Sequence, residues 1–332
     1  MIIDKIINKI SNCSKISQSD KNLYERFFMN NKDNHYSNKW TFIEQITQCN
    51  KGIKYFDRKK EHLITIAPDW GSDIPNYVYL PLGKNAITSV PDVAKKLSNI
   101  LHTRVYVKKI YGEENKNYLL RKGLNETDLD ENLAGDDKFP EILVDIDTII
   151  KASKGIHTKI NMRYFRRRIR KALAYIESGD WIVYERPLSF NIKNDFKDFV
   201  DRWSTDFANR SLKYYKDFNK TKAEVSSVYY PSFLDIIEKQ TFCYLTYIND
   251  KPVAFTSAYA ISSTCLAVNG SLSDTSFPGL IQYIFTQLAY KAKLSGYQQL
   301  NLGSNDYSSQ DRYKSSMGMI DKIFPYIFYY DN

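Results

Sequence analysis

Cysteine and histidine are both scarce in this sequence, with four residues of each in a chain of 332. The cysteines, at positions 13, 49, 243 and 265, are widely scattered and form no C-x-x-C pair. We therefore expect reduced, buried thiols in a cytoplasmic protein rather than a disulfide framework. The histidines form neither an H-x-H nor an H-E-x-x-H pattern, which argues against a metalloenzyme.

Long apolar runs are also lacking. No stretch approaches the ~18 apolar residues of a transmembrane helix, and Asp4, Lys5 and Lys9 interrupt the N-terminal segment, which argues against a secretory signal. The G-x-x-x-x-G-K-[ST] phosphate loop and the G-x-S-x-G nucleophile motif do not occur either, which argues against a nucleotide hydrolase and a serine hydrolase. We expect a soluble, cytoplasmic protein with no integral membrane segment.

The length suits two domains, and the 26 tyrosines and 18 phenylalanines favour strands and aromatic surfaces. Strand-like and helix-like patterns alternate in both halves, which predicts an α/β protein. A polar, acid-rich segment at 112–140 reads as a linker or a long surface loop. We place the boundary near Asp130, giving an N-terminal domain over residues 1–130 and a C-terminal domain over 131–332.

Residues 242–318 carry the clearest pattern. Apolar runs on either side of Asn249-Asp250 predict a β-hairpin, and a third strand follows over residues 265–272. Apolar residues from Leu280 onward recur at helical spacing until Gly296 ends the helix. A short strand then opens into a polar loop at 303–307, and a basic helix with Asp311, Arg312, Tyr313 and Lys314 ends before Gly318.

A second informative stretch is strongly basic. Residues 159–176 predict a helix that packs by one face, with its cations on the other: Lys159, Arg163, Arg166, Arg167, Arg170 and Lys171. Together with a formal net charge of +9, this face suits the phosphate backbone of a polyanion. The alternative is a solvated basic face that binds no partner.

Four pieces of the sequence resemble a known family. They are Gly155 with the basic residues 163–171, the hairpin at 247–255, the strand at 300–303, and the segment 311–318 with its aromatic-Lys pair before a glycine. Together they resemble GNAT-type acyltransferases, and in particular the tandem-GNAT proteins related to the C-terminal domain of phosphatidylglycerol lysyltransferases and to the Fem peptidoglycan-bridge transferases. The resemblance implies two GNAT-like domains, each a mixed sheet flanked by helices.

The resemblance also implies a reaction and roles for individual residues. The reaction is transfer of an aminoacyl group from aminoacyl-tRNA, as co-substrate, to an amine or hydroxyl acceptor, without a cofactor, a metal or a covalent enzyme intermediate. Lys314 would stabilise the oxyanion or bind the terminal phosphate of the donor, and Asp306 or Asp311 would act as base. The cations at 159–171 would hold the tRNA acceptor stem. The expected substrate-binding residues are Asn269, Ser271, Asn301, Gly303, Ser304, Asn305 and Tyr313.

Ordinary structural explanations exist for these residues as well. Lys314 also fits an exposed helix lysine, and the Asn, Asp and Ser residues fit simple turn chemistry. Where a CoA-dependent GNAT protein holds the pyrophosphate on a glycine-rich turn, residues 274–279 offer an aspartate, a proline and one glycine, which argues against acetyl-CoA. Two alternatives stay open: an N-acyltransferase that uses acyl-CoA or acyl-carrier protein, and a non-catalytic GNAT-like RNA-binding protein.

Overall fold

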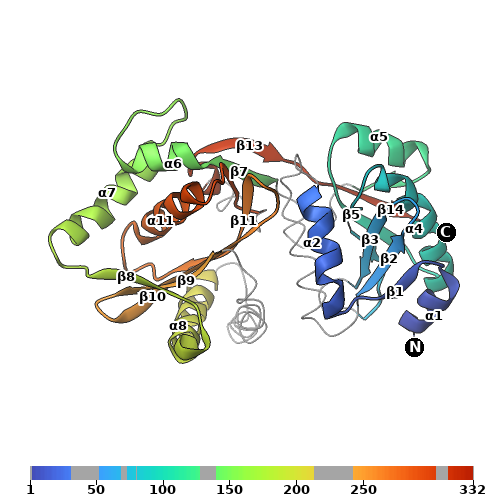
Figure 1. Ribbon diagram of the computed structural model, residues 1–332, viewed down its shortest axis with the longest axis horizontal. Coiled ribbons are helices and arrows are strands. Elements are labelled where there is room, and N and C mark those ends of the chain that lie inside the picture. The colour runs from blue at the N-terminus through green and yellow to red at the C-terminus, as the bar shows by residue number, and fades with distance from the viewer. Residues whose placement is uncertain are drawn as a thin grey trace.

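The computed structural model describes residues 2–30, 52–68, 73–79, 81–127, 140–212, 242–303 and 313–331. Within them, the strands form two seven-stranded sheets with helices on both faces of each (Figure 1). Each sheet with its helices makes one lobe, and the two lobes lie side by side in the figure. The predicted α/β class, with two mixed sheets flanked by helices, is confirmed.

The first sheet has the strand order β1-β2-β3-β4-β5-β14-β6. Its strands are β1 (Cys13–Lys15), β2 (Ile53–Asp57), β3 (His62–Ala67), β4 (Tyr77–Val78), β5 (Val105–Ile110), β14 (Tyr326–Tyr330) and β6 (Asn125–Glu126). The main core of this lobe is formed by residues from α1 (Ile2–Lys9), α4 (Val90–Leu101) and α5 (Glu113–Arg121) on one face of the sheet. The opposite face packs against α2 (Lys21–Asn30).

Helix α4 shows how local signals set an element of this lobe. Pro91 lies in its first turn, where a missing N–H costs nothing, and His102 ends it in a left-handed conformation with φ of 54°. Its buried residues follow helical spacing and face the sheet. The short 3₁₀ helix η2 (Ala86–Ser89) leads into it. The predicted helix over residues 91–101 is thus confirmed.

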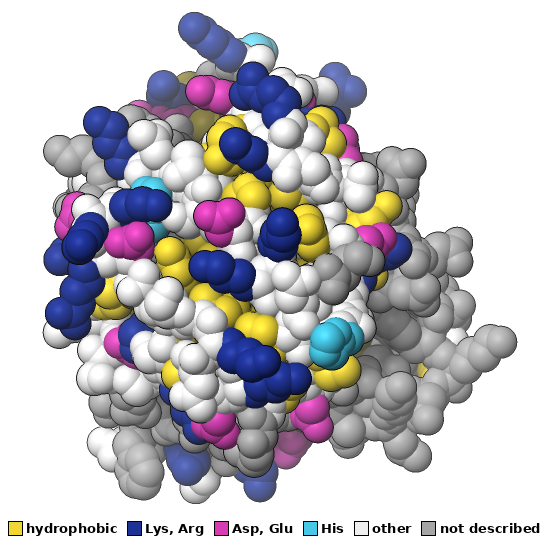
Figure 2. All heavy atoms as spheres, turned by 90° about the vertical axis from the view of Figure 1, so that its right-hand side faces the viewer, with side chains coloured by type: hydrophobic (Ala, Val, Ile, Leu, Met, Phe, Trp, Pro, Cys, Tyr) yellow, Lys and Arg dark blue, Asp and Glu magenta, His cyan; other side chains and the backbone are white. Residues whose placement is uncertain are grey.

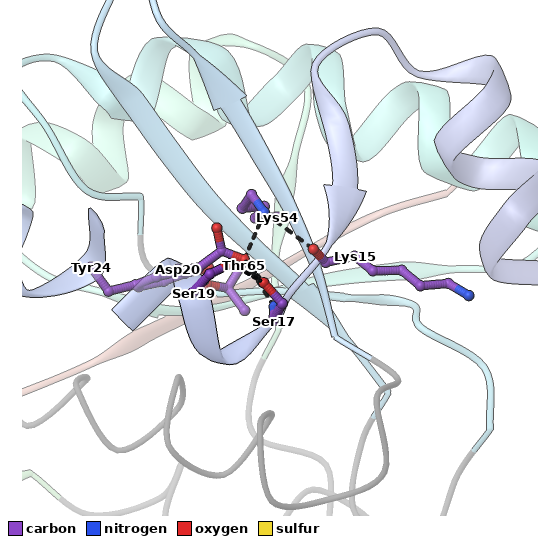
Figure 3. Close-up of polar contacts among 7 residues, drawn as sticks. All are labelled: Lys15, Ser17, Ser19, Asp20, Tyr24, Lys54 and Thr65. Carbon is purple, nitrogen blue, oxygen red and sulfur yellow. Dashed lines mark hydrogen bonds and ion pairs between the residues drawn. The ribbon is translucent and has the colours of Figure 1, made fainter. Parts of the chain in front are cut away.

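A polar cluster ties the start of α2 to the sheet (Figure 3). The Lys54 ammonium lies 2.7 Å from the Asp20 carboxylate in the 3₁₀ helix η1 (Gln18–Asp20), and it also donates to the Lys15 carbonyl at 3.1 Å. One turn into the helix, the hydroxyls of Tyr24 and Thr65 are 2.9 Å apart. The Lys54–Asp20 side chains are only 15% and 13% exposed, so this ion pair is shielded from solvent and fixes the helix on β2 and β3.

The second sheet has the order β13-β7-β12-β11-β10-β9-β8. Its strands are β13 (Met319–Ile323), β7 (Glu141–Asp145), β12 (Gln299–Asn301), β11 (Cys265–Ser273), β10 (Lys251–Ala260), β9 (Phe242–Ile248) and β8 (Val183–Pro187). One face packs against α6 (Ile146–Ser153), α7 (Arg163–Glu177) and α11 (Leu280–Leu294). The other face packs against α8 (Lys193–Ser211), which follows the 3₁₀ helix η4 (Phe190–Ile192).

The β9–β10 hairpin confirms a turn predicted from two residues. Asn249 and Asp250 both have positive φ, 48° and 64°, as a tight two-residue hairpin requires. The turn is also held from outside, because the Asn249 side chain accepts the Ile182 N–H at 2.9 Å and donates to the Asp180 carbonyl at 3.0 Å. The hairpin is thereby fixed to the segment that leads into β8.

The two lobes share chain segments and contacts. After β13 in the second sheet, the chain crosses to β14, which inserts between β5 and β6 of the first sheet. The Tyr111 hydroxyl, next to β5, donates to the buried Glu141 carboxylate at the start of β7 at 2.6 Å. β14 therefore belongs to the first sheet, although it lies in the proposed C-terminal domain. The domain limits 1–130 and 131–332 stay a proposal.

The predicted linker at 112–140 is corrected for its first part. Residues 113–121 form α5, in which Leu119 is fully buried against the core of the first lobe. Glu113 and Glu114 lie in its first turn and Arg121 in its last, which complements the helix dipole. The polar composition suggested a loop because this helix buries only one narrow side. Residues 128–139 lie outside the described part of the chain.

Candidate active site

Two parallel strands separate at the centre of the second sheet. β11 and β12 pair over three residues, and the last pair is Ala267 with Asn301. Beyond it, β11 stays with β10, whereas Leu302 and Gly303 follow β7: the Leu302 N–H donates to the Ile142 carbonyl at 2.9 Å, and the Ile142 N–H donates to the Gly303 carbonyl at 3.3 Å. We call this place the β11–β12 divergence. Four of the predicted substrate-binding residues lie on its two arms: Asn269, Ser271, Asn301 and Gly303.

The β11 arm contains a bulge. Ser257 of β10 lies opposite Gly270 and Ala258 opposite Val268, so Asn269 has no partner on β10. A side chain at Gly270 would place its Cβ 2.8 Å from the Phe255 ring, so glycine is needed there for close packing. Bulges interrupt a ladder and re-aim the backbone, and they are common beside active sites. The predicted residue Asn269 thus lies at the one irregularity in the β10–β11 pairing.

The next predicted residue on this arm is Ser271. It lies directly opposite Thr256 of β10, and both hydroxyls are buried. Neither hydroxyl has a hydrogen-bond partner in the described part of the chain. Buried polar groups are normally satisfied, so an unsatisfied neighbouring pair is unusual in a strand interior.

On the other arm, Asn301 makes internal contacts. Its amide nitrogen donates to the Glu141 carboxylate at 2.7 Å, and its amide oxygen accepts the Gly303 N–H at 2.7 Å. Asn301 and Glu141 are fully buried, and Tyr111 of the first lobe donates to the other oxygen of the same carboxylate. The structure therefore places Asn301 where it holds Gly303 in position; its direct contact with a substrate stays a prediction. Burial, with Glu141 nearby, raises the pKa of the Cys265 thiol to about 12.

Tyr313 and Lys314 follow the polar loop in a helical turn. The Tyr313 ring packs against the core beneath α11, and burial raises the pKa of its phenol strongly. The Gln282 amide of α11 lies 3.4 Å from the phenol oxygen. Lys314 is half-buried beside it. Tyr313 is therefore next to α11, on the side of the sheet that carries α7, and Lys314 follows it in the same helical turn.

Four predicted residues fall in the segment 304–312, outside the described residues. They are Ser304, Asn305, Asp306 and Asp311. This segment joins Gly303 at the divergence to Tyr313, so both of its ends lie at the site. The assignment of Asp306 or Asp311 as base and of Ser304 and Asn305 as substrate ligands stays a prediction.

The predicted basic helix is present as α7, but it begins later than expected. It starts at Arg163, directly after a turn in which the Asn161 side chain accepts the Arg163 N–H at 3.1 Å, and Lys159 lies before the helix. Phe165, Ile169 and Ala172 are buried on one side. The opposite side, with Lys159, forms what we call the cationic face: Lys159, Arg163, Arg166, Arg167, Arg170 and Lys171.

The cationic face is accessible and carries no compensating charge. Five of its side chains are exposed and Arg166 is half-buried. Within the described ranges, none of the six pairs with a carboxylate, and the first turn of α7 contains no acidic residue. The end of the molecule formed by the first lobe is different, because Lys and Arg there lie among Asp and Glu (Figure 2). The six cations at α7 thus form a group without acidic partners in the described part of the chain.

α7 lies directly against the start of α11. Gly279, with φ of 85°, precedes α11, and a Cβ at this position would lie 2.1 Å from the Arg168 carbonyl oxygen. The turn before it is closed by an acid, because the Asp274 carboxylate accepts the N–H and the hydroxyl of Ser276 at 2.9 and 2.6 Å. The carboxylate near this helix start opposes the binding of a pyrophosphate.

Sequence patterns missed several residues of this site. Glu141 reads as the polar edge of an apolar run, and nothing in one sequence shows that Tyr111 from the other lobe meets it. Gln282 is an isolated polar residue on a buried helix face, which was a detectable signal. Among the described residues, no group of three or more His, Cys, Asp or Glu side chains has a metal-binding arrangement, and no helix is long and apolar enough to cross a membrane.

No known family model matches the sequence, and no curated protein is detectably similar to it. Solved structures are similar over nearly the whole chain. A conserved protein of unknown function from Bacteroides thetaiotaomicron has a TM-score of 0.69 at 12% identity, over 95% of this chain and 98% of that one. L-PGS from Bacillus licheniformis has a TM-score of 0.57 at 16% identity, over 94% and 92%.

FemX has a TM-score of 0.51 at 12% identity, over 95% of this chain and 96% of that one. At such identities the likeness concerns the fold, and it extends over both lobes in every case. The fold expected from the resemblance in the sequence is therefore confirmed: the chain has the tandem-GNAT fold, with two mixed sheets and their flanking helices.

Proposed function

We propose that this protein is an acyltransferase that moves an aminoacyl group from aminoacyl-tRNA to an amine or hydroxyl acceptor. The β11–β12 divergence is the proposed site of reaction. The resemblance of the sequence to tandem-GNAT aminoacyl transferases, and the structural likeness to FemX and L-PGS, support the reaction class. The proposal concerns the donor; the identity of the acceptor is open.

The observation that carries the proposal is the cationic face of α7. Six cations without carboxylate partners in the described structure lie on α7 or shortly before it, and α7 packs against the start of α11 and lies close to Tyr313. Arginine binds phosphate through a planar fork of donors, and five of the residues in α7 form a row suited to a nucleic acid backbone. A tRNA acceptor stem on this face would bring its acylated end toward the divergence.

The proposed chemistry is attack on an ester. The acceptor nitrogen or oxygen attacks the carbonyl carbon of the aminoacyl ester, and a tetrahedral oxyanion forms. The ester C–O bond then breaks, and the proton of the attacking group passes to the ribose hydroxyl that leaves. Lys314 would stabilise the oxyanion, and Asp306 or Asp311 would accept the proton and return it to the leaving oxygen.

The arms of the divergence would hold the donor. Ser271 and Asn269 lie on β11, and Gly303 begins the loop on the other arm. Unsatisfied buried hydroxyls such as that of Ser271 are suited to hydrogen bonds with the amino and carbonyl groups of an aminoacyl ester. Asn301 and Glu141 would not contact the substrate in this arrangement; they would hold the backbone of Gly303 in position through the Asn301 side chain.

A donor assay tests the proposal. Purified protein is incubated with total tRNA charged with one labelled amino acid at a time, beside labelled acetyl-CoA, with a cell extract as the source of acceptor. We expect one or a few amino acids to leave tRNA, and Lys314→Ala to abolish their loss. Lys151→Ala, an exposed lysine of α6, is the matched control.

The outcomes separate the classes. Release of label from tRNA that depends on Lys314 supports the proposal, and the label then identifies the acceptor. Consumption of acetyl-CoA while tRNA stays charged would show that the turn at Asp274 does accept a CoA pyrophosphate, and would replace aminoacyl transfer by CoA-dependent transfer. Binding of tRNA without turnover of either donor would make the protein a binding module.

A further inference from the structure

Tyr164, the second residue of α7, has an exposed ring close to two cations. The side chain is 36% exposed, and the guanidinium groups of Arg167 and Arg168 lie 5.8 and 5.4 Å from the ring centroid. The Arg168 guanidinium also donates to the Tyr164 hydroxyl at 3.1 Å. The ring is therefore held in place by a hydrogen bond and flanked by positive charge, at the edge of the cationic face.

The surroundings of Tyr164 lead into the candidate site. Burial raises the pKa of the Tyr313 phenol. Tyr164 and Arg168 lie close enough to Tyr313 to change this pKa further, Tyr164 upward and Arg168 downward. The Tyr313 hydroxyl in turn lies 3.4 Å from the side-chain amide of Gln282, a residue of α11 that is 2% exposed. The polar groups thus form a series from the surface inward: the exposed Tyr164 ring, the half-buried Arg168 guanidinium, the buried Tyr313 phenol and the buried Gln282 amide.

The other exposed tyrosine of the same helix has a structural role. Tyr175 is 40% exposed, but one face of its ring stacks on Trp181 with centroids 4.6 Å apart and planes at 13°. Trp181 in turn makes an edge contact with Phe277, so Tyr175 belongs to a packed aromatic group. In the described part of the chain, no aromatic ring stacks on Tyr164, and its side chain is 36% exposed, so part of the ring is accessible to a ligand.

We propose that Tyr164, together with Arg167 and Arg168, forms a stacking platform for an unpaired nucleobase in the single-stranded 3′ end of the donor tRNA. This inference rests on the proposed function and adds to it the group that positions the acylated end. The cationic face binds phosphates and does not distinguish bases. An aromatic ring flanked by arginines binds the face of a base, and stacking of this kind suits single-stranded nucleic acid.

The position of the platform favours the single-stranded end over the duplex. Stacking on a protein ring requires a base that is not already stacked in a helix. The aminoacyl group is carried by the terminal nucleotide of the unpaired end, and it must reach the β11–β12 divergence. Tyr164 lies at the end of α7 that adjoins Tyr313 and Gln282, so a base held there brings the following ester close to the divergence.

The test uses the full chain and two uncharged tRNA probes at one fixed salt concentration. One probe is intact tRNA, and the other is the same tRNA with its unpaired 3′ nucleotides removed. The variants are Tyr164→Ala, Tyr164→Phe and, as the control on the same helix, Tyr175→Ala. Dissociation constants are measured by fluorescence anisotropy, and thermal unfolding confirms that each variant is folded.

We expect Tyr164→Ala to bind intact tRNA about 10- to 100-fold more weakly and trimmed tRNA like the unchanged protein. Tyr164→Phe keeps the ring and should keep most of the affinity. Equal effects of Tyr164→Ala on both probes, or an equal loss in Tyr175→Ala, would overturn the platform while leaving tRNA as the donor. If the unchanged protein binds neither probe, both the platform and the tRNA donor are wrong.

Discussion

Neutralising part of the cationic face should weaken tRNA binding in a way that salt titration can measure. The variant replaces Arg163, Arg166 and Arg170 by glutamine, which keeps side chains of similar length and polarity. Each phosphate contact made by a cation releases counterions, so the logarithm of the binding constant falls with the logarithm of salt concentration by about 0.9 per contact. If all six cations engage phosphates, the slope is about −5, and the triple variant should show about −3.

These slopes give a large difference in affinity. Raising salt from about 50 to about 200 mM should weaken the unchanged protein roughly 1000-fold and the variant only about 60-fold. The comparison uses fluorescence anisotropy with total tRNA at four salt concentrations. The control replaces three exposed cations of the first lobe, Lys95, Lys96 and Arg121, and so changes the net charge equally.

The structure also predicts that this loss of binding does not come from unfolding. The three arginines take part in four like-charge pairs at spacing i, i+3 or i, i+4 on α7, and each such pair destabilises a helix by about 0.2–0.5 kcal/mol. The triple variant should therefore have an unchanged or slightly higher free energy of unfolding. An equal salt slope in the variant and the unchanged protein would refute the assignment of α7 as the tRNA surface.

Three further predictions concern the supports of the site and of the first lobe. The Glu141 carboxylate accepts hydrogen bonds from Tyr111 and Asn301, so Glu141→Gln leaves one of these buried donors without an acceptor. The free energy of unfolding, measured by urea titration, should fall by about 1–3 kcal/mol. A fall of under about 0.5 kcal/mol would contradict the proposed role of Glu141. Lys54→Met leaves the shielded Asp20 carboxylate (Figure 3) without its ion-pair partner and should lower the free energy of unfolding by about 1–3 kcal/mol. Lys15→Met removes an ion pair with Asp4 that is about half exposed, and it should lower the free energy of unfolding by under about 0.5 kcal/mol. Burial raises the pKa of Cys243 and Cys265 from 9.0 to about 12, so these thiols should resist a disulfide reagent at about pH 8 until urea unfolds the protein. The stability that they contribute below pH 9.0 should be lost between pH 9.0 and about 12. Rapid reaction of the folded protein, in a variant with only these two cysteines, would count against that burial.

Elements set by neighbouring residues could be predicted from the sequence. The β9–β10 hairpin follows from Asn249 and Asp250, which tolerate positive φ, and from the apolar runs beside them. Helix α11 follows from helical spacing of its apolar residues, and Gly296, with φ of 89°, follows its end as expected. In both cases the decisive interactions lie within about 20 residues along the chain.

Features that depend on distant contacts could not be predicted. The contact between Tyr111 and Glu141 joins two lobes, and neither residue shows a pattern that reveals the other. The bulge at Asn269 depends on how β10 and β11 align, and a single strand pattern does not show it. The sequence therefore predicted the strands on which Asn269, Ser271 and Asn301 lie, whereas the buried groups beside them emerged only from the fold.

The return of β14 to the first sheet has a consequence for how the protein is made. A ribosome releases the first lobe's other strands roughly 200 residues before Tyr326–Tyr330 emerge, since β6 ends at Glu126. Until then β5 has no neighbour on one side and β6 has no strand to pair with, because β14 lies between them. Such an open edge invites pairing with other chains. The nascent first lobe therefore stays incomplete until β14 is made, and its folding finishes only after the second lobe has been synthesised.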